Sequence, residues 1–279
     1  MSRLSLALVL LVGILAGGLG VSLLTRPAHV APDEVRGIVS EMLSADAGSR
    51  LGAADINMLI EDYLMSDPAI LERMSAKLTA AKQVEKRQAQ AAIISANHST
   101  IYDDPANVVI GNPEGDVTLV EMFDYNCTYC RGALPDLAAL VAEDGNLKLV
   151  LKEFPILSEG SIAAAKVAYL VAEDEDLDYW AFHQKLFSSR GQVDAAAALA
   201  AAEAVGGSRV ELMINMEGQA PKDAIQRNYA LATALNVTGT PTFIIGDEVI
   251  AGALGIDALR AKIANVRACG STICPVPAG

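Results

Sequence analysis

The chain has 279 residues, of which 52% are hydrophobic and 20% are charged, and its formal net charge is −13 at pH 7. This composition supplies enough apolar material for a globular core and excludes a chain that is disordered throughout. Binding to a phosphate backbone requires concentrated basic charge, so the acidic balance and the lack of a Lys/Arg cluster argue against a nucleic-acid partner.

Residues 1–26 are expected to form a signal anchor or a signal peptide. Arg3 precedes an apolar stretch over 4–24, and Arg26 follows it. About 20 apolar residues are enough to span a bilayer, whereas the apolar region of a cleaved signal usually has about 7 to 15. We therefore favour an uncleaved anchor in the inner membrane, with cleavage as the alternative. Either segment exports the body of the chain, which predicts a periplasmic location where disulfide chemistry is the default for the four cysteines.

Residues 33–97 are predicted to form a helical extension. Apolar residues recur there at helical spacing, and Asp67 followed by Pro68 is a strong signal for the start of a helix, here expected over 68–96. The apolar stripe of that helix is too narrow to bury the helix alone. We expect the extension to pack against copies of itself, which makes the chain a homo-oligomer; packing against its own chain is the alternative.

The remainder of the chain follows an α/β order. A linker and domain entry is expected over 98–116. The elements after it are strands at 117–123 and 147–154, a helical block at about 158–236, two strands within 241–253, and a closing helix at 256–266. A strand, a helix, a second strand, a helical block, a hairpin and a final helix indicate an α/β fold.

Cys127 and Cys130 follow the first strand and open the first helix, with two residues between them. The unpaired amides and the dipole at a helix start favour a negative charge, so a Cys127 thiolate is expected to be stabilised. Cys130 lies one turn later on the same side, within reach of a disulfide. So short a loop stabilises the fold little, which favours a redox role over an inert disulfide. A metal site is the other alternative, but further ligands are missing nearby in the sequence.

The segment FDYNCTYCRGALP, residues 123–135, resembles the active-site segment of the exported DsbA-like thiol-disulfide oxidoreductases. Cys127 to Cys130 match the CxxC motif of that family, and Glu121 matches its buried acid. Pro135 matches the proline of the active-site helix, and Thr240-Pro241 matches the cis-proline loop. The resemblance covers about 105–268. It implies a thioredoxin fold over 117–268, with the helical block as the insertion typical of DsbA-like proteins.

Glu121 is expected to relay a proton near Cys130. Both faces of its strand are mainly apolar, as in a central strand, where an acid is unfavourable unless it has a role. An exposed position on an edge strand is the alternative. Lys152 on the next strand is considered as the charge partner of Glu121. The resemblance further implies that Thr240 and Pro241 present backbone to an incoming client strand.

The direction of electron flow is expected to depend on Thr128 and Tyr129. Strong oxidants of the DsbA type carry a histidine at the second of these positions, whereas Tyr129 brings no positive charge. The chain is therefore predicted to be a weaker oxidant than DsbA, with isomerase or reductase slightly favoured over oxidase. The extension of residues 33–97 resembles that of the ScsC-like subgroup, in which a multimer would place several active sites around one client.

Cys269 and Cys274, at the start of the tail 269–279, are expected to form a structural disulfide. No cofactor and no bound metal is expected. The predicted partners are exported proteins with thiols or disulfides, and a membrane redox protein that resets the CxxC pair. The competing hypothesis is a copper- or zinc-binding envelope protein that uses the same thiols without catalysis.

Overall fold

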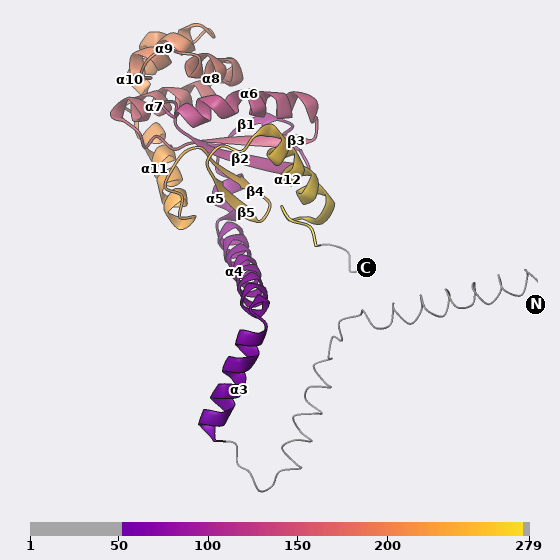
Figure 1. Cartoon of the computed structure of the whole chain (residues 1–279). Helices are drawn as coiled ribbons and strands as arrows, with labels where there is room; N and C mark the ends of the chain where they lie inside the picture. The colour runs from indigo at the N-terminus through magenta and orange to yellow at the C-terminus, as the bar shows by residue number, and fades with distance from the viewer. Residues whose placement is uncertain (1–51, 276–279) are drawn as a thin grey trace, which may run out of the picture. The chain divides into compact units, whose positions relative to one another are not determined.

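The structure is a computed structural model that describes residues 52–275 (Figure 1). The predicted signal segment, residues 1–26, and the first part of the predicted extension lie outside the described residues. Within residues 52–275 no helix is both long enough and apolar enough to cross a membrane. The chain divides into two units, residues 1–75 and residues 76–279.

In the first unit the described residues form helix α3 (Ala53–Ser66) and the beginning of helix α4 (Ala69–Ala96). Gly52 is the N-cap residue of α3, and its backbone N–H donates to Asp55 Oδ2 at 2.8 Å. None of the residues of α3 is buried. Large apolar side chains on this helix, including Leu59 and Tyr63, are each 60% exposed.

The second unit contains a five-stranded sheet in the order β1-β3-β2-β4-β5. The strands are β1 (Val108–Gly111), β2 (Val117–Phe123), β3 (Leu147–Glu153), β4 (Thr242–Ile245) and β5 (Glu248–Ala251). The central strand β2 runs parallel to β3 and antiparallel to β4. These three strands agree with the sequence prediction, and the two faces of β2 are both covered as its apolar pattern indicated.

The two faces of the sheet belong to two clusters of buried side chains. The odd-numbered residues of β2, such as Leu119 and Phe123, pack in the larger cluster with helix α6 (Thr128–Glu143) and helix α12 (Ile256–Cys269). The even-numbered residues, such as Val120, pack with the end of α4, with helix α5 (His98–Tyr102) and with helix α11 (Gln219–Ala234). This division decides which side chains of β2 and β3 reach the cysteine pair.

Between β3 and β4 the chain inserts five helices, as the resemblance implied. They are α7 (Glu159–Glu173), α8 (Tyr179–Phe187), α9 (Ala195–Glu203), α10 (Arg209–Asn215) and α11. Figure 1 shows α8, α9 and α10 lying beyond α7, on the side of the sheet that α6 also covers. Gly191, between α8 and α9, and Gly206, between α9 and α10, have φ of 81° and 101°, a backbone conformation that favours glycine.

Residues 98–116, expected to be a linker and domain entry, also contain two ordered elements. Helix α5 buries Ile101 completely, and β1 pairs antiparallel with β3, Val108 opposite Leu151. A four-residue strand between Pro, Asn and Gly residues is too short to produce a distinct periodic pattern. The edge strand β1 was therefore not predicted from the sequence and is identified by its pairing with β3.

Candidate active site

The loop between β2 and α6 places Cys127 at the start of a helix. Asp124 holds this loop: its Oδ1 accepts from Asn126 N at 2.8 Å, and its Oδ2 accepts from Ile156 N at 2.8 Å and from Leu157 N at 2.9 Å. Cys127 N donates to the Asp124 carbonyl at 2.9 Å. The loop after β2 is thus tied to the loop after β3, which fixes the first cysteine relative to the sheet.

Asn126 ties the same loop to the inserted helices. Its Nδ2 donates to Ser161 Oγ at 2.9 Å and to the Val193 carbonyl at 2.8 Å, and its Oδ1 accepts from Val193 N at 2.7 Å. These bonds join the residue before Cys127 to α7 and to the segment that precedes α9. The inserted helices therefore take part in positioning the thiol pair.

Cys127 is the N-cap residue of α6, and its sulfur accepts from Cys130 N at 3.3 Å. Both thiols are reduced in this structure, with Cys127 5% and Cys130 1% exposed. The backbone amide of Cys130 and the helix dipole place positive partial charge at the Cys127 sulfur. Thr128 and Tyr129, between the two cysteines, are both exposed, and Tyr129 is 72% exposed. The first thiol is thus placed for reaction and the second is shielded behind it.

The turn before β4 faces Cys127. The Thr240–Pro241 peptide bond is cis, in agreement with the resemblance, and the Cys127 thiol donates to the Thr240 carbonyl at 3.2 Å. A groove of about 590 Å³ extends from this turn between Lys86 and Gln90 of α4 and Val249 of β5. Backbone groups of the turn are therefore directly beside the reactive sulfur and open onto a cleft.

Glu121 lies on the face of β2 that carries α6 and the cysteine pair, between Leu119 and Phe123. It is 1% exposed, and its Oε1 has no hydrogen-bond partner among the described residues. Burial raises the pKa of Glu121 from its usual 4.5 to about 8. Burial and the neighbouring Glu121 charge raise the pKa of the Cys130 thiol well above its usual value. The alternative of an exposed edge-strand position is excluded.

The expectation that Lys152 pairs with Glu121 is wrong. In the parallel register Glu121 lies opposite Leu151, so Lys152 points to the opposite face of the sheet. Its Nζ donates to the Thr100 carbonyl at 2.8 Å, and the nearby charge of Asp104 favours the ammonium form. Burial outweighs this attraction and lowers the pKa of Lys152 from 10.5 to about 8. Glu121 consequently has no cation from β3 beside it.

A buried polar cluster beside the cysteine loop was not predicted from the sequence. Tyr125 Oη lies 3.0 Å from His183 Nδ1 and 3.3 Å from Tyr179 Oη, and the Tyr179 hydroxyl donates to Glu153 Oε1 at 3.4 Å. Burial lowers the pKa of His183 to about 3, so its imidazole is neutral and supplies no positive charge near the thiols. The common site of these four residues depends on the meeting of a loop, a strand and an inserted helix, and no spacing within one segment of the sequence indicates it.

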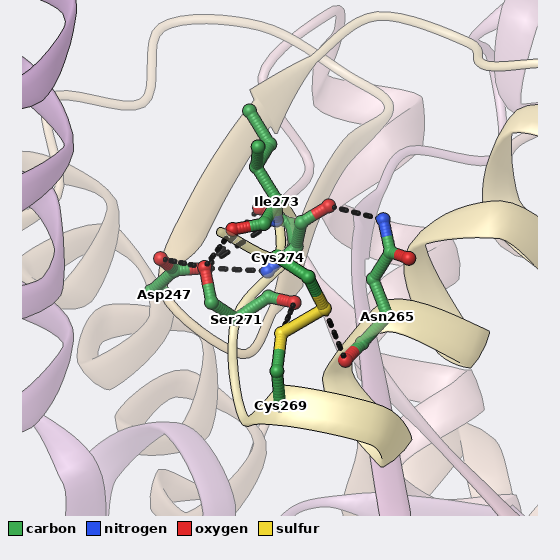
Figure 2. The surroundings of a disulfide bond; sticks show 7 residues. Asp247, Asn265, Cys269, Ser271, Ile273 and Cys274 are labelled. Atoms are coloured by element: carbon green, nitrogen blue, oxygen red, sulfur yellow. Dashed lines mark hydrogen bonds between the residues drawn. A yellow bond between two sulfur atoms is a disulfide. The ribbon is translucent and has the colours of Figure 1, made fainter. Parts of the chain in front are cut away.

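Cys269 and Cys274 form a disulfide at the end of α12, as expected, with a Cα–Cα distance of 5.9 Å. Figure 2 shows how the loop closed by this bond is held: Asp247, in the turn between β4 and β5, accepts from Ser271 Oγ at 2.7 Å and from Thr272 N at 2.8 Å. Asn265 Nδ2 donates to the Thr272 carbonyl at 2.9 Å. These contacts join the last helix to the hairpin β4–β5.

Over residues 52–275 the structure brings together no group of three His, Cys, Asp or Glu side chains suited to hold a metal ion. The arrangement present is instead a thiol pair at a helix start, facing a cis-proline turn, above a buried acid. A thiolate stabilised by a helix start, with a second thiol one turn away, is equipped for thiol-disulfide exchange. This combination of fold and site defines a thioredoxin-fold thiol-disulfide oxidoreductase.

A family model described as thioredoxin matches residues 103–265. The chain therefore belongs to the thioredoxin family, among the DsbA-like disulfide oxidoreductases. A thioredoxin-like oxidoreductase from Silicibacter pomeroyi is 38% identical, with a TM-score of 0.59, and the match covers 62% of this chain and 99% of that one. A linker-deletion mutant of Proteus mirabilis ScsC is 26% identical, with a TM-score of 0.61, over 80% of this chain and 99% of that one.

The thiol-disulfide exchange protein alpha-DsbA2 from Wolbachia pipientis is 26% identical, with a TM-score of 0.59. The match covers 65% of this chain and 98% of the Wolbachia chain. Among curated proteins, disulfide bond formation protein D of Bacillus subtilis is 24% identical over 56% of this chain and 74% of its own length. The chain also matches sodium/proton antiporters of Salinispora arenicola and Salinispora tropica, at 25% and 24% identity, but spans only 25% and 29% of their lengths.

Proposed function

We propose that the chain is an exported enzyme that forms, reduces or isomerises disulfide bonds of envelope proteins through Cys127 and Cys130. The observation that carries this proposal is the position of the Cys127 sulfur. It accepts from the Cys130 amide at 3.3 Å and lies 3.2 Å from the Thr240 carbonyl. One contact belongs to the helix start that favours a thiolate, and the other to the backbone turn at which we propose that a client binds.

The reaction begins when the Cys127 thiolate attacks a client disulfide. A Cys127–client disulfide forms, and the other client sulfur leaves with the electron pair and takes a proton. The client then rearranges, or Cys130 resolves the mixed disulfide. In resolution the ionised fraction of Glu121 accepts the Cys130 proton, the Cys130 sulfur attacks the Cys127 sulfur, and the client leaves reduced while the cysteine pair is oxidised. The buried position of Glu121 supports this role in proton transfer.

Client binding is proposed at Thr240 and Pro241. An extended client segment that pairs with the Thr240 backbone is held mainly by main-chain hydrogen bonds, which accept many sequences. The groove beside the turn supports this proposal, because it continues from Pro241 toward Gln90 of α4. A client cysteine held at the turn would lie next to the Cys127 sulfur.

We favour isomerisation or reduction over dedicated oxidation. Tyr129 is 72% exposed and uncharged, and His183 is buried and neutral, so neither aromatic residue stabilises the thiolate through a positive charge. A less stabilised thiolate is a more reducing one. We therefore keep the prediction that this chain is a weaker oxidant than DsbA.

The predicted extension is proposed to form the oligomer. The exposed apolar side chains of α3, among them Leu59 and Tyr63, have no cover within the described residues, and such surfaces usually mark an interface. An oligomer would present several thiol pairs to one client. Anchoring in the inner membrane through residues 4–24, and a membrane protein that resets the pair, complete the proposal.

The test compares two variants of the full-length chain purified in detergent. Cys127→Ala is expected to abolish both insulin reduction and the refolding of scrambled ribonuclease. Cys130→Ala is expected to accumulate a mixed disulfide with the client, because attack still occurs and resolution does not. Activity that persists in Cys127→Ala would show that the exchange reaction does not depend on the Cys127–Cys130 pair.

A further inference from the structure

A second carboxyl, that of the half-buried Glu153, lies on the same face of the sheet as Glu121. In the register of β2 and β3, Glu121 is opposite Leu151, so Glu153 is two residues further along the neighbouring strand. Residues two apart on a strand point to the same face. Glu153 therefore projects to the same face as Glu121, where it meets Tyr179 of α8 and a small cavity lined by α7 and α11.

The carboxyl of Glu153 is held by few contacts. Its Oε1 accepts from the Tyr179 hydroxyl at 3.4 Å, and its Oε2 is buried without a hydrogen-bond partner among the described residues. Glu153 and Tyr179 also line a cavity of about 20 Å³ together with Tyr169 of α7. A space of that size is sufficient for one water molecule. A carboxyl with one long hydrogen bond, next to a space of this size, is able to gain and lose a proton.

The ionisable groups that face Glu153 are acidic or neutral. Glu121 lies on β2, Asp124 in the loop after it, Tyr125 next along that loop and Tyr179 on α8, and Tyr169 of α7 lines the same cavity. Burial and the charges of Asp124 and Glu121 raise the pKa of Glu153 well above its usual value, and the Tyr179 hydrogen bond opposes this change. With no cation in this set, two negative charges on Glu121 and Glu153 repel each other in a buried environment.

We propose that Glu153 and Glu121 form a coupled carboxyl pair on this face of the sheet, in which Glu153 is a positioning residue that controls when Glu121 carries negative charge beside the Cys130 thiol. This inference rests on the proposed function, since it concerns the proton that Glu121 takes from Cys130. While Glu153 keeps its proton, Glu121 alone exchanges with the thiol. At higher pH Glu153 also ionises, and the second charge disfavours the Cys130 thiolate that must attack the mixed disulfide.

The experiment measures the two steps of the reaction with oxidised glutathione as the probe. The reduced full-length chain is mixed with glutathione disulfide, quenched with acid, and analysed by mass spectrometry. The first step is the addition of glutathione to Cys127, and the second is its release by Cys130. The second rate is followed against pH in the wild type and in Glu153→Gln, with Glu114→Gln as the control for an exposed carboxyl.

The ratio of the second rate in Glu153→Gln to that in the wild type is expected to be near one at the lower pH values, where Glu153 is protonated, and to rise with pH as Glu153 ionises. The first step and the Glu114→Gln control should be unchanged. A ratio that stays at one across the range overturns the proposal. Failure of the first step in the wild type would instead refute the proposed function, so the two failures are distinguishable.

Tyr179→Phe provides a second test that leaves the carboxyl in place. This variant removes the hydroxyl that donates to Glu153, which disfavours the ionised form. In the wild type the second rate falls below that of Glu153→Gln as the pH rises. In Tyr179→Phe this fall should begin at a higher pH. If Glu153→Gln does not fold, the wild type and Tyr179→Phe are compared directly, and identical pH profiles overturn the proposal.

Discussion

Replacement of Glu121 by glutamine is predicted to stabilise the protein while it impairs resolution of mixed disulfides. Burial raises the pKa of Glu121 from 4.5 to about 8. Between these values the unfolded chain is ionised at this position and the folded chain is protonated, so unfolding releases a proton. The free energy of unfolding then falls by about 1.4 kcal/mol for each unit that the pH rises. Below the pKa that Glu121 has in the unfolded chain there is no loss of stability, and the loss grows as the pH rises to the pKa that Glu121 has in the folded chain.

From pH 4.5 to pH 7 this loss amounts to about 3 kcal/mol for the wild type. Glutamine has nearly the shape of the protonated acid and does not ionise. Glu121→Gln is therefore expected to be about 3 kcal/mol more stable than the wild type at pH 7 and equally stable at pH 4.5. The assay is urea unfolding of the reduced protein at several pH values, followed by the fluorescence of Trp180, the single tryptophan of the chain.

A difference in stability that is the same at pH 4.5 and pH 7 would refute this reasoning, and so would a variant less stable than the wild type at both. Glu114→Gln serves as the control, since its carboxyl is exposed and its replacement should leave the pH dependence unchanged. The same Glu121→Gln preparation should resolve the glutathione adduct of Cys127 more slowly than the wild type. Gain in stability together with loss of rate would show that the acid is kept for its proton chemistry.

The remaining predictions concern redox direction, the disulfide and the extension. Tyr129→His should make the protein more oxidising in equilibrium with glutathione, because an imidazolium beside Cys127 stabilises the thiolate, whereas Tyr129→Phe should change the equilibrium little. Replacement of Cys269 and Cys274 by serine should lower the free energy of unfolding by about 2 kcal/mol, which is the value expected for a loop closed over a sequence separation of 5. A urea unfolding curve that does not change would contradict this prediction. Leu59→Asp with Tyr63→Asp, on the exposed stripe of α3, should convert the oligomer to a monomer in native mass spectrometry, and an unchanged mass would remove α3 from the interface.

The sequence was sufficient for features that are local. The pattern of 117–123 and the helix start at Cys127 needed only neighbouring residues, and both agree with the structure. The cis bond at Thr240–Pro241 was implied only by the resemblance, since the general preference of X-Pro bonds is trans. Local pattern and family motif together therefore located the thiols and the turn that faces them.

Features that depend on pairing between distant segments were missed or mistaken. The choice of Lys152 as the partner of Glu121 required the register of β2 and β3, and a shift of one residue reverses the face of every side chain. The cluster of Tyr125, Glu153 and His183 required the contact of a loop, a strand and an inserted helix. None of these relations is present in the spacing of residues along one segment.

The position of Lys152 bears on why Glu121 remains protonated. A lysine on the α6 face would stabilise the Glu121 carboxylate and lower its pKa, and the acid would then be a weaker base toward Cys130. The structure instead places that ammonium group on the far face, with Thr100 and Asp104, and leaves Glu121 in apolar surroundings with Glu153 as its ionisable neighbour on β3. A carboxyl with a pKa of about 8 is matched to a thiol proton near neutral pH, whereas one at 4.5 is not. The separation of the two charges by the sheet thus lowers stability at neutral pH and preserves the basicity that resolution requires.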